Sequence, residues 1–458
     1  MDRRKVLAGG LALMASSLAH GGMPKAGRRP NFIVICCDDL GYGDIGPTGG
    51  RDIPTPHLDR LAREGLTLTD YYAPANVCTP SRAGLLTGRY PIRTGLSKVL
   101  LAADRATMPR SEVTIAQALK PAYRSALIGK WHLGHSGPSW SPTFYGFDLF
   151  YGIPYSHDIA PLKVFEFDQS GQTGEWEPDY PRLQQRFYER AERFIEEQRN
   201  QPFFLELALS SPHLPNYSAP GFEGKSRSAG AYGDSVMEID AIVGRLVAKL
   251  KALGIDRDTM LVFTSDNGPW FEGSTGDLRQ RKGGGAYDGA SRVPFIARWP
   301  GRIPANRRSE AIAMGIDLLP TFCELANLPL PSGVELDGKD IAPVLTRGGA
   351  SPHAELLLFQ GEDIVGLRTQ AWKYVSADFY MDRLMYLEGR GYPQLYDMGR
   401  PGEQYSVASL HPDIVVTMQE RLRAVTAQFA ALRTGPSPLD SQRAAPPRRN
   451  VPRQWLPQ

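Results

Sequence analysis

Apolar residues recur along the chain in two patterns, short β-branched runs and longer segments with helical spacing. The short runs predict β-strands at residues 31–37, 125–129, 203–209 and 260–265. The segments whose apolar residues lie three or four positions apart predict helices at 57–64, 111–119, 183–200 and 234–253. Strands that alternate with helices are typical of an α/β fold, in which helices cover both faces of a sheet.

The pattern changes near residue 351, where the apolar runs become shorter. Strand-like pieces at 354–360, 364–369, 372–377 and 393–398 precede a helix from about 412 to 432. We therefore expect a large domain over residues 30–350 and a small α+β domain with an antiparallel sheet over 351–433. Residues 434–458 are rich in proline and arginine with little to bury, and we expect a disordered tail there.

The first 22 residues have the pattern of an export signal. Arg3 and Arg4 precede an apolar run from Val6 to Leu18, which is typical of the twin-arginine route to the bacterial periplasm. An amphipathic first helix is the alternative, but the segment is apolar all round and rich in glycine. The run is too short for an ordinary membrane span, and no other stretch approaches the required length, so we expect no integral membrane segment.

Composition narrows the classes of function. The chain has 458 residues, 42% hydrophobic and 22% charged, which is ample for a large core. Its formal charge is +3, and much of the arginine excess lies at the two ends, so no basic stripe indicates nucleic acid as a partner. The four cysteines are too few and too scattered for a disulfide scaffold.

Cys78 differs from the other cysteines in its surroundings. The adjacent Cys36 and Cys37 lie in an apolar run, where strand geometry sends them to opposite faces as core thiols. Cys78 lies in the polar stretch ANVCTPSR. An unpaired, exposed thiol is a liability in an exported protein, so Cys78 requires a chemical explanation.

Polar clusters follow four of the predicted strands. They are Asp38 with Asp39, Lys130 with His132, Pro212 with His213, and Asp266 with Asn267. Ligands of open α/β sheets bind outside the carboxyl ends of the strands, so these clusters can converge on one pocket. Each pair alone is explained as well by a strand-end turn. The carboxylate and amide oxygens suit a hard divalent cation such as calcium or magnesium.

The stretch CTPSRAGLLTGR at 78–89 predicts a short helix. Thr79 is a suitable N-cap, Pro80 suits the first helical position and Gly88 is a natural stop. Cys78 would then lie at an exposed helix start, where free N–H groups favour an anion. Arg82 adds a planar fork suited to a tetrahedral oxyanion, although a capped helix with a structural cysteine remains the simpler alternative.

The CTPSR…LLTGR pattern resembles the signature of the type I sulfatases, in which the cysteine is converted to formylglycine. DDLGYGD at 38–44, GKWHLG at 129–134 and TSDNGP at 264–269 resemble further motifs of that family. GIPYSHD at 152–158 and YGDSVMEID at 232–240 are similar to the arylsulfatase A and N-acetylgalactosamine-6-sulfatase branch. The resemblance implies an alkaline phosphatase-like fold, with a large mixed sheet flanked by helices and a smaller C-terminal antiparallel sheet.

The resemblance also implies a role for each matching position. The ligands of one calcium ion would be Asp38, Asp39, Asp266, Asn267 and the modified residue 78. Arg82 and Lys130 would stabilise the formylglycine, and His132 would be the base. Ser156, His213 and Lys282 would hold the sulfate. In RKGGGAYDG, however, one more glycine than the family pattern has separates Lys282 from Tyr287 and Asp288.

The activity implied is hydrolysis of a sulfate monoester, from a sulfated small molecule or glycan, after maturation by a formylglycine-generating enzyme. Two other functions remain open. One is a phosphodiesterase or phosphonate hydrolase of the same superfamily. The other is a catalytically silent protein that binds sulfated glycans.

Overall fold

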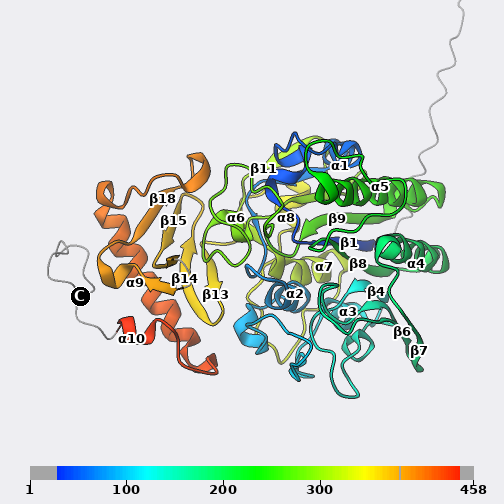
Figure 1. Cartoon of the computed structure of the whole chain (residues 1–458), viewed down its shortest axis with the longest axis horizontal. Helices are drawn as coiled ribbons and strands as arrows, with labels where there is room; N and C mark the ends of the chain where they lie inside the picture. The colour runs from blue at the N-terminus through cyan, green and yellow to red at the C-terminus, as the bar shows by residue number, and fades with distance from the viewer. Residues whose placement is uncertain (1–27, 381–382, 444–458) are drawn as a thin grey trace, which may run out of the picture.

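The computed structural model describes residues 28–380 and 383–443, and its main feature is a ten-stranded mixed sheet (Figure 1). Five parallel strands form the centre, in the order β9 (Thr259–Ser265), β1 (Asn31–Asp38), β8 (Phe203–Pro212), β4 (Arg124–Lys130) and β5 (Leu149–Ile153). The edge strands are β10 (Phe295–Arg298), β2 (Leu66–Leu68) and β11 (Arg307–Ser309) on one side, and β6 (Val164–Asp168) and β7 (Gly171–Trp176) on the other. The five parallel strands therefore end at one edge of the sheet.

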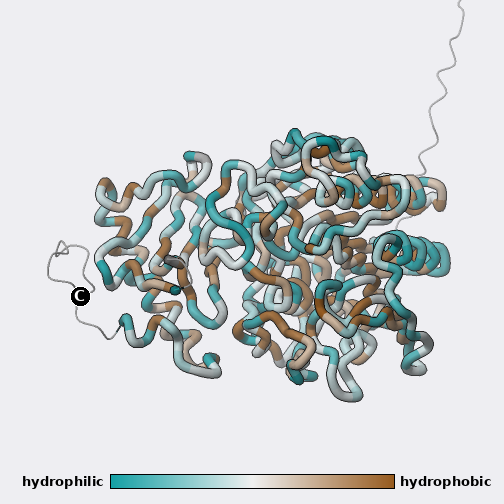
Figure 2. The backbone as a smooth tube through the Cα atoms, viewed as in Figure 1, coloured by the Kyte–Doolittle hydropathy of each residue, from teal (hydrophilic) through white to brown (hydrophobic). Residues whose placement is uncertain are grey.

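Helices cover both faces of this sheet, as Figure 1 shows. Helices α1 (Pro56–Arg63), α4 (Leu183–Gln198) and α5 (Gly230–Ala252) lie on one face, and α2 (Cys78–Thr87), α3 (Ile115–Leu119) and α7 (Leu318–Ala326) lie on the other. Alternation along β1 places Cys36 in the apolar core under α2 and Cys37 in the core under α5, as predicted. In Figure 2 hydrophobic segments concentrate in the interior, whereas α4 is largely hydrophilic. The predicted fold class is confirmed.

The predicted helix at 111–119 is shorter than expected. Only Ile115–Leu119 is helical, because Thr114 acts as the N-cap and its side chain accepts a hydrogen bond from the Gln117 N–H. The side chain of Gln117 in turn accepts a hydrogen bond from the Thr114 N–H, which completes a capping box. The capping interaction therefore sets the helix start four residues after Ser111.

A second, four-stranded antiparallel sheet lies at the C-terminal end (Figure 1). Its strands are β13 (Leu356–Gln360), β14 (Asp363–Arg368), β15 (Trp372–Val375) and β18 (Gln394–Asp397), and helix α9 (Pro412–Phe429) packs on them. The smaller elements are α6 (Asp288–Ser291), α8 (Ala342–Arg347), α10 (Asp440–Arg443), β3 (Tyr71–Tyr72), β12 (Ala313–Met314), β16 (Ala377–Tyr380) and β17 (Arg383–Tyr386). None of the described helices combines the length and apolar character needed to cross a bilayer.

Buried ion pairs join the small sheet to a loop and a short helix of the preceding part of the chain. Arg368 of β14 lies 2.6 Å from Asp70, and Lys373 of β15 lies 2.8 Å from Glu403 and also contacts Asp288 of α6. Glu403 accepts a hydrogen bond from the Asp288 N–H at 2.9 Å. Because α6 follows directly on the loop that carries Lys282, this network anchors that loop to the C-terminal sheet.

Residues 434–443, which fall in the expected disordered tail, make specific contacts with the rest of the protein. Leu439 is fully buried, Ser437 donates a hydrogen bond to Asp363, and Arg433 pairs with Asp440 at 3.2 Å. The prediction is therefore wrong for residues 434–443, because Leu439 packs into the C-terminal core, which composition does not reveal. Residues 444–458 and the expected export signal at residues 1–22 lie outside the described part of the chain.

Glu206 is a buried acid in the middle of β8. Its Oε2 has no hydrogen-bond partner, and burial, partly offset by Arg82, raises the pKa of Glu206 to about 7. This pKa lies above the ordinary value of 4.5, so the folded state binds the proton more tightly than the unfolded chain. Stability is therefore lost as the pH rises between these two values.

Replacing Glu206 by glutamine is expected to stabilise the protein at pH 8 by about 3 kcal/mol and to add little near pH 4.5. Denaturant unfolding at the two pH values measures the difference. Replacing the exposed Glu420 by glutamine is the matched control and should change stability little at either pH. An equal gain for Glu206→Gln at both pH values would contradict this account.

Candidate active site

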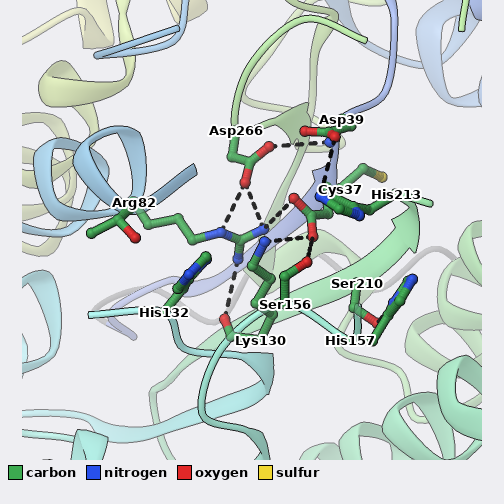
Figure 3. A network of polar contacts seen from close by, with 12 residues as sticks. Cys37, Asp39, Arg82, Lys130, His132, Ser156, His157, Ser210, His213 and Asp266 are labelled. Carbon is green, nitrogen blue, oxygen red and sulfur yellow. Dashed lines mark hydrogen bonds and ion pairs between the residues drawn. The ribbon is translucent and has the colours of Figure 1, made fainter. Parts of the chain in front are cut away.

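The four polar clusters that follow the parallel strands meet at one edge of the sheet, close to the start of α2 (Figure 3). This convergence follows from the parallel arrangement, which places the carboxyl ends of β1, β4, β8 and β9 side by side. Three carboxylates and three cationic side chains are gathered there, and all of them except the half-buried Lys282 are buried. They are Asp38, Asp39, Asp266, Arg82, Lys130 and Lys282.

Asp38, at the end of β1, is surrounded by donors. Lys130 Nζ lies 2.6 Å from its Oδ2, Ser156 Oγ lies 3.5 Å from the same oxygen, and Arg82 Nη2 lies 3.7 Å from Oδ1. Burial alone would raise the pKa of Asp38, but Lys130, followed by His213 and Arg82, holds it well below its usual range. Asp38 is therefore a carboxylate at neutral pH.

Asp39 connects a second group of site residues. Its Oδ1 accepts a hydrogen bond from Asn267 Nδ2 at 2.7 Å, and its Oδ2 lies 2.7 Å from Lys282 Nζ and 3.5 Å from His213 Nε2. The backbone of Asp39 has a φ of 66°, in the left-handed region that non-glycine residues seldom adopt. Such strain is retained where the surrounding structure requires it, often at functional sites.

Arg82 is held rigidly from α2. Its Nε and Nη2 lie 2.9 and 2.8 Å from Asp266 Oδ2, and its Nη1 donates to the carbonyl of Lys130 at 3.1 Å. The guanidinium is almost fully buried, so these contacts are made without competition from water. Arg82 is thus fixed in position before any ligand binds.

Cys78 lies deeper than the sequence predicted. It is the first residue of α2, with only 2% of its surface exposed, and the extended Val77 rather than Thr79 occupies the N-cap position. The Thr79 hydroxyl instead accepts a hydrogen bond from the Leu100 N–H at 3.2 Å. The helix start therefore has no side-chain cap, and the predictions of an exposed cysteine and of a Thr79 cap are both wrong.

Burial determines the chemical state of the unmodified thiol. It raises the pKa of Cys78 to about 12, although Lys130 and Lys282 act in the opposite direction. A thiol with such a pKa is not ionised at neutral pH, and the thiolate is the nucleophilic form. An unmodified Cys78 would therefore be a poor nucleophile in this site.

His132 lies beyond the end of β4 with a left-handed φ of 60°, and it is 1% exposed. Burial, and then Lys130, lower the pKa of His132 well below its usual value, so the ring is neutral at neutral pH. Its Nε2 lies 2.9 Å from the carbonyl of Leu100, which assigns the hydrogen to Nε2. The buried Nδ1 has no partner, so its lone pair is available to accept a proton.

Lys282 reaches the site across the glycine-rich turn that departs from the family pattern. Gly283 and Gly285 have φ values of 76° and 67°, a conformation that glycine adopts without strain. Asn76 fastens this turn, since its carbonyl accepts the Gly283 N–H at 2.8 Å and its Nδ2 donates to the Gly285 carbonyl at 3.0 Å. The additional glycine is accommodated in the turn, and Lys282 Nζ still contacts Asp39.

The oxygen atoms of the site fit a hard cation. Ligand atoms of Asp38, Asp39, Cys78 and His213 all lie within 4.8 Å of one another, a set that includes a sulfur and a ring nitrogen and does not include the predicted ligand Asp266. Asp38 Oδ1 and Asn267 Oδ1 are buried without hydrogen-bond partners. Buried acceptors of this kind are costly unless a donor or a cation satisfies them. Carboxylate and amide oxygens are the ligands that calcium and magnesium prefer.

Sequence reasoning missed three neighbours of this site. Asn76 precedes Cys78 by two residues and pins the Lys282 turn, and His157 lies with its ring centroid 5.7 Å from that of His213. Trp270 directly follows the TSDNGP motif, and its ring lies 5.5 Å from His213. Each of the three lies within or close to a family motif in the sequence, and this position could have identified them as site residues.

Comparisons with known proteins identify related chains. The model of the Sulfatase family matches residues 30–328, and that of "N-sulphoglucosamine sulphohydrolase, C-terminal" matches residues 285–386. The chain is 37% identical to arylsulfatase A of Homo sapiens, with 90% of each chain covered. It is 35% identical to N-acetylgalactosamine-6-sulfatase of Canis lupus familiaris, covering 79% of this chain and 74% of that one. The solved PsFucS1 sulfatase from Pseudoalteromonas sp. is similar with a TM-score of 0.81 and 29% identity, covering 90% of this chain and 92% of that one.

Proposed function

This chain belongs to the sulfatase family and is a sulfuric ester hydrolase, and we propose that it cleaves sulfate monoesters with a formylglycine derived from Cys78 and one calcium ion. One observation carries the proposal. The cysteine of the CTPSR pattern is buried at an uncapped helix start, with its Sγ within 4.8 Å of ligand atoms of Asp38 and Asp39. A lone structural cysteine would not require carboxylates as neighbours.

The two groups would supply complementary chemistry. A hydrated formylglycine offers one hydroxyl to attack sulfur and a second whose deprotonation expels sulfate. A bound calcium ion polarises sulfuryl and hydroxyl oxygens as a Lewis acid. We assign the calcium to Asp38, Asp39, Asp266, Asn267 and residue 78, whose oxygens suit a hard cation.

The cationic residues of the site act on the sulfuryl group. The guanidinium of Arg82, held by Asp266, and the ammonium of Lys130 stabilise negative charge near residue 78. In this proposal Lys282 and His213 hold the sulfate and one of them gives the leaving alcohol its proton, which their positions next to Asp39 support. The hydroxyl of Ser156, which lies beside Asp38, donates a hydrogen bond to the sulfate in this proposal. Because these groups are already held in position, little reorganisation is needed during reaction.

His132 is the base in this proposal. Its neutral ring with a free Nδ1 is in the correct state to take a proton from the second hydroxyl of residue 78. The carbonyl of Leu100 fixes its tautomer, as the orienting carboxylate does in other histidine-dependent sites. Burial thus keeps the ring neutral in the resting enzyme, so that the lone pair of Nδ1 is free to accept a proton.

We propose a sulfated carbohydrate as the natural substrate, since the chain is 35% identical to a protein named for a sulfated sugar, N-acetylgalactosamine-6-sulfatase. A formylglycine-generating enzyme would act on Cys78 before folding, because the folded protein buries that residue. Arg3 and Arg4 before the apolar run support export to a bacterial periplasm by the twin-arginine route. Fractionation of the producing cells tests the localisation.

Matched esters test the reaction. We expect kcat/KM for 4-nitrophenyl sulfate to exceed that for 4-nitrophenyl phosphate by at least about a hundredfold, because a site built for one anion rejects another of different charge. Peptide mass spectrometry of the same preparation should find the aldehyde at position 78. A preference for phosphate would favour the phosphodiesterase or phosphonate hydrolase alternative. An unconverted Cys78 without any turnover would favour a silent glycan-binding protein.

A further inference from the structure

Trp270 and Phe271 form an aromatic pair beside the candidate active site. Their rings are stacked, with centroids 4.8 Å apart and planes 28° apart. Phe271 is 68% exposed and Trp270 is half-buried. A large apolar side chain exposed singly is common, but a stacked pair that extends from a buried polar site into solvent is a surface suited to a ligand.

The inner member of the pair faces the groups assigned to the sulfate. The Trp270 ring centroid lies 5.5 Å from that of His213 and 5.3 Å from Lys282 Nζ. These two residues are placed to protonate the leaving alcohol. Because both residues lie beside the indole ring, a sulfate ester that they hold, as proposed above, has its alcohol part close to that ring.

The backbone of the pair is anchored to the segment that carries Lys282. Arg281 Nη1 donates to the carbonyls of Trp270 at 2.5 Å and Phe271 at 2.7 Å. The Lys282 N–H donates to the carbonyl of Pro269 at 3.0 Å. The aromatic pair and Lys282 are therefore held in fixed relative positions. A substrate ring that binds on the aromatic pair is thereby aligned with Lys282 at little entropic cost.

Further aromatic rings flank His213 on another side. The centroid of the His157 ring lies 5.7 Å from that of His213 and 5.7 Å from that of Tyr217, and the Tyr217 ring packs at a tilt of 32° against Tyr180 with centroids 5.0 Å apart. His157 is held between Ser210 Oγ and the carbonyl of Pro215, at 3.2 and 3.0 Å. His213 thus has two aromatic neighbours, the rings of His157 and Trp270.

We propose that Trp270 and Phe271 form the binding platform for the sugar ring that carries the sulfate ester, and that this ring is a pyranose. The inference rests on the proposed function and specifies its substrate class. Stacking on an aromatic face suits the C–H-rich face of a pyranose. The outer ring of the platform is exposed, and its polar neighbours are Arg281, which contacts both backbone carbonyls of the pair, and the exposed Glu272, which follows Phe271 directly. A steroid or another large apolar alcohol would require an enclosed apolar pocket instead.

The test compares Phe271→Ala, Phe271→Tyr and Trp270→Leu with the unmodified enzyme, using the 6-sulfates of N-acetylgalactosamine, N-acetylglucosamine and galactose and also 4-nitrophenyl sulfate. We expect Phe271→Ala to lower kcat/KM for the sugar sulfate that the enzyme hydrolyses best by about tenfold, mainly through KM. Trp270→Leu should have a larger effect, and Phe271→Tyr should restore most of the activity. Tyr405→Ala, at another exposed aromatic residue, is the matched control and should change nothing.

Binding supplies a readout that does not depend on turnover. In a Cys78→Ala background, which retains the platform, Phe271→Ala should weaken the Kd for the same sugar sulfate about tenfold, measured by calorimetry. An unchanged Kd and KM for sugar sulfates would overturn the platform. Losses restricted to 4-nitrophenyl sulfate would overturn the pyranose assignment. Absence of activity on every sulfate ester, with the sugar still bound through Phe271, would instead contradict the proposed function.

Discussion

Replacing Cys78 by serine is expected to reduce the enzyme to at most one turnover, with the sulfate retained as an ester on the serine. A seryl hydroxyl can attack sulfur, but it lacks the second hydroxyl whose deprotonation expels sulfate. Cys78→Ala removes the attacking group altogether. We expect either variant to lose steady-state activity by a factor on the order of 10⁴ to 10⁶, the range measured when a nucleophile is deleted. Intact-protein mass spectrometry should show the added sulfate only for the serine variant.

Stability measurements separate this effect from unfolding. Cys78 is 2% exposed, so its truncation to alanine removes a buried sulfur and should cost about 1 kcal/mol, far too little to unfold the domain. Cys323→Ala is the matched control, because Cys323 is equally buried in α7 but lies outside the site. That variant should keep full activity. Sustained turnover by Cys78→Ser without conversion of the serine would show that residue 78 does not work through an aldehyde hydrate.

Removal of calcium by prolonged dialysis against a chelator is expected to lower kcat/KM by a factor on the order of 10² or more, with recovery on addition of calcium. The three cationic side chains of the site are already paired with its three carboxylates. They therefore cannot replace the positive charge that calcium would direct at the sulfate. Elemental analysis before dialysis should find one calcium per chain. Thermal unfolding should show a lower Tm for the stripped protein.

Asn267→Ala is the genetic counterpart, because it removes one oxygen ligand without changing the net charge. Asn267 Oδ1 is buried and unpartnered, so the variant should lose affinity for calcium and lose activity that excess calcium partly restores. Asn200→Ala, at an exposed position, is the control and should behave as the unmodified protein. Stoichiometric zinc, or two metal ions per chain, would contradict the assignment and favour a phosphatase-like enzyme.

Much of the fold was predictable because its patterns are local. Short apolar runs identified β1, β4, β8 and β9 to within a few residues, and helical spacing identified α1, α4 and α5. The polar pairs at the strand ends were predicted to converge, since parallel strands end at one edge. The sequence alone therefore predicted that residues such as Asp38, Lys130 and Asp266 lie close together.

Other features depended on contacts between distant parts of the chain. Local pattern made Cys78 appear exposed, but packing of α2 on the sheet buries it, and that burial raises the pKa of its thiol to about 12. Composition predicted disorder from residue 434, yet Leu439 finds a place in the C-terminal core. In both cases burial is decided by what packs against the residue, which no local window contains.

The sequence by itself therefore determined the family resemblance, the order of elements and the chemical types gathered at one edge of the sheet, because periodicity and motif spacing are properties of short segments. Only the tertiary structure decided how Lys282 reaches Asp39 across its additional glycine, since that depends on Asn76, about 200 residues earlier, fastening the turn. It also decided that Trp270 faces His213, because two loops from different strands meet there. Such contacts are set by the packing of the whole domain, and the free energy of each depends on partners that adjacent residues do not specify.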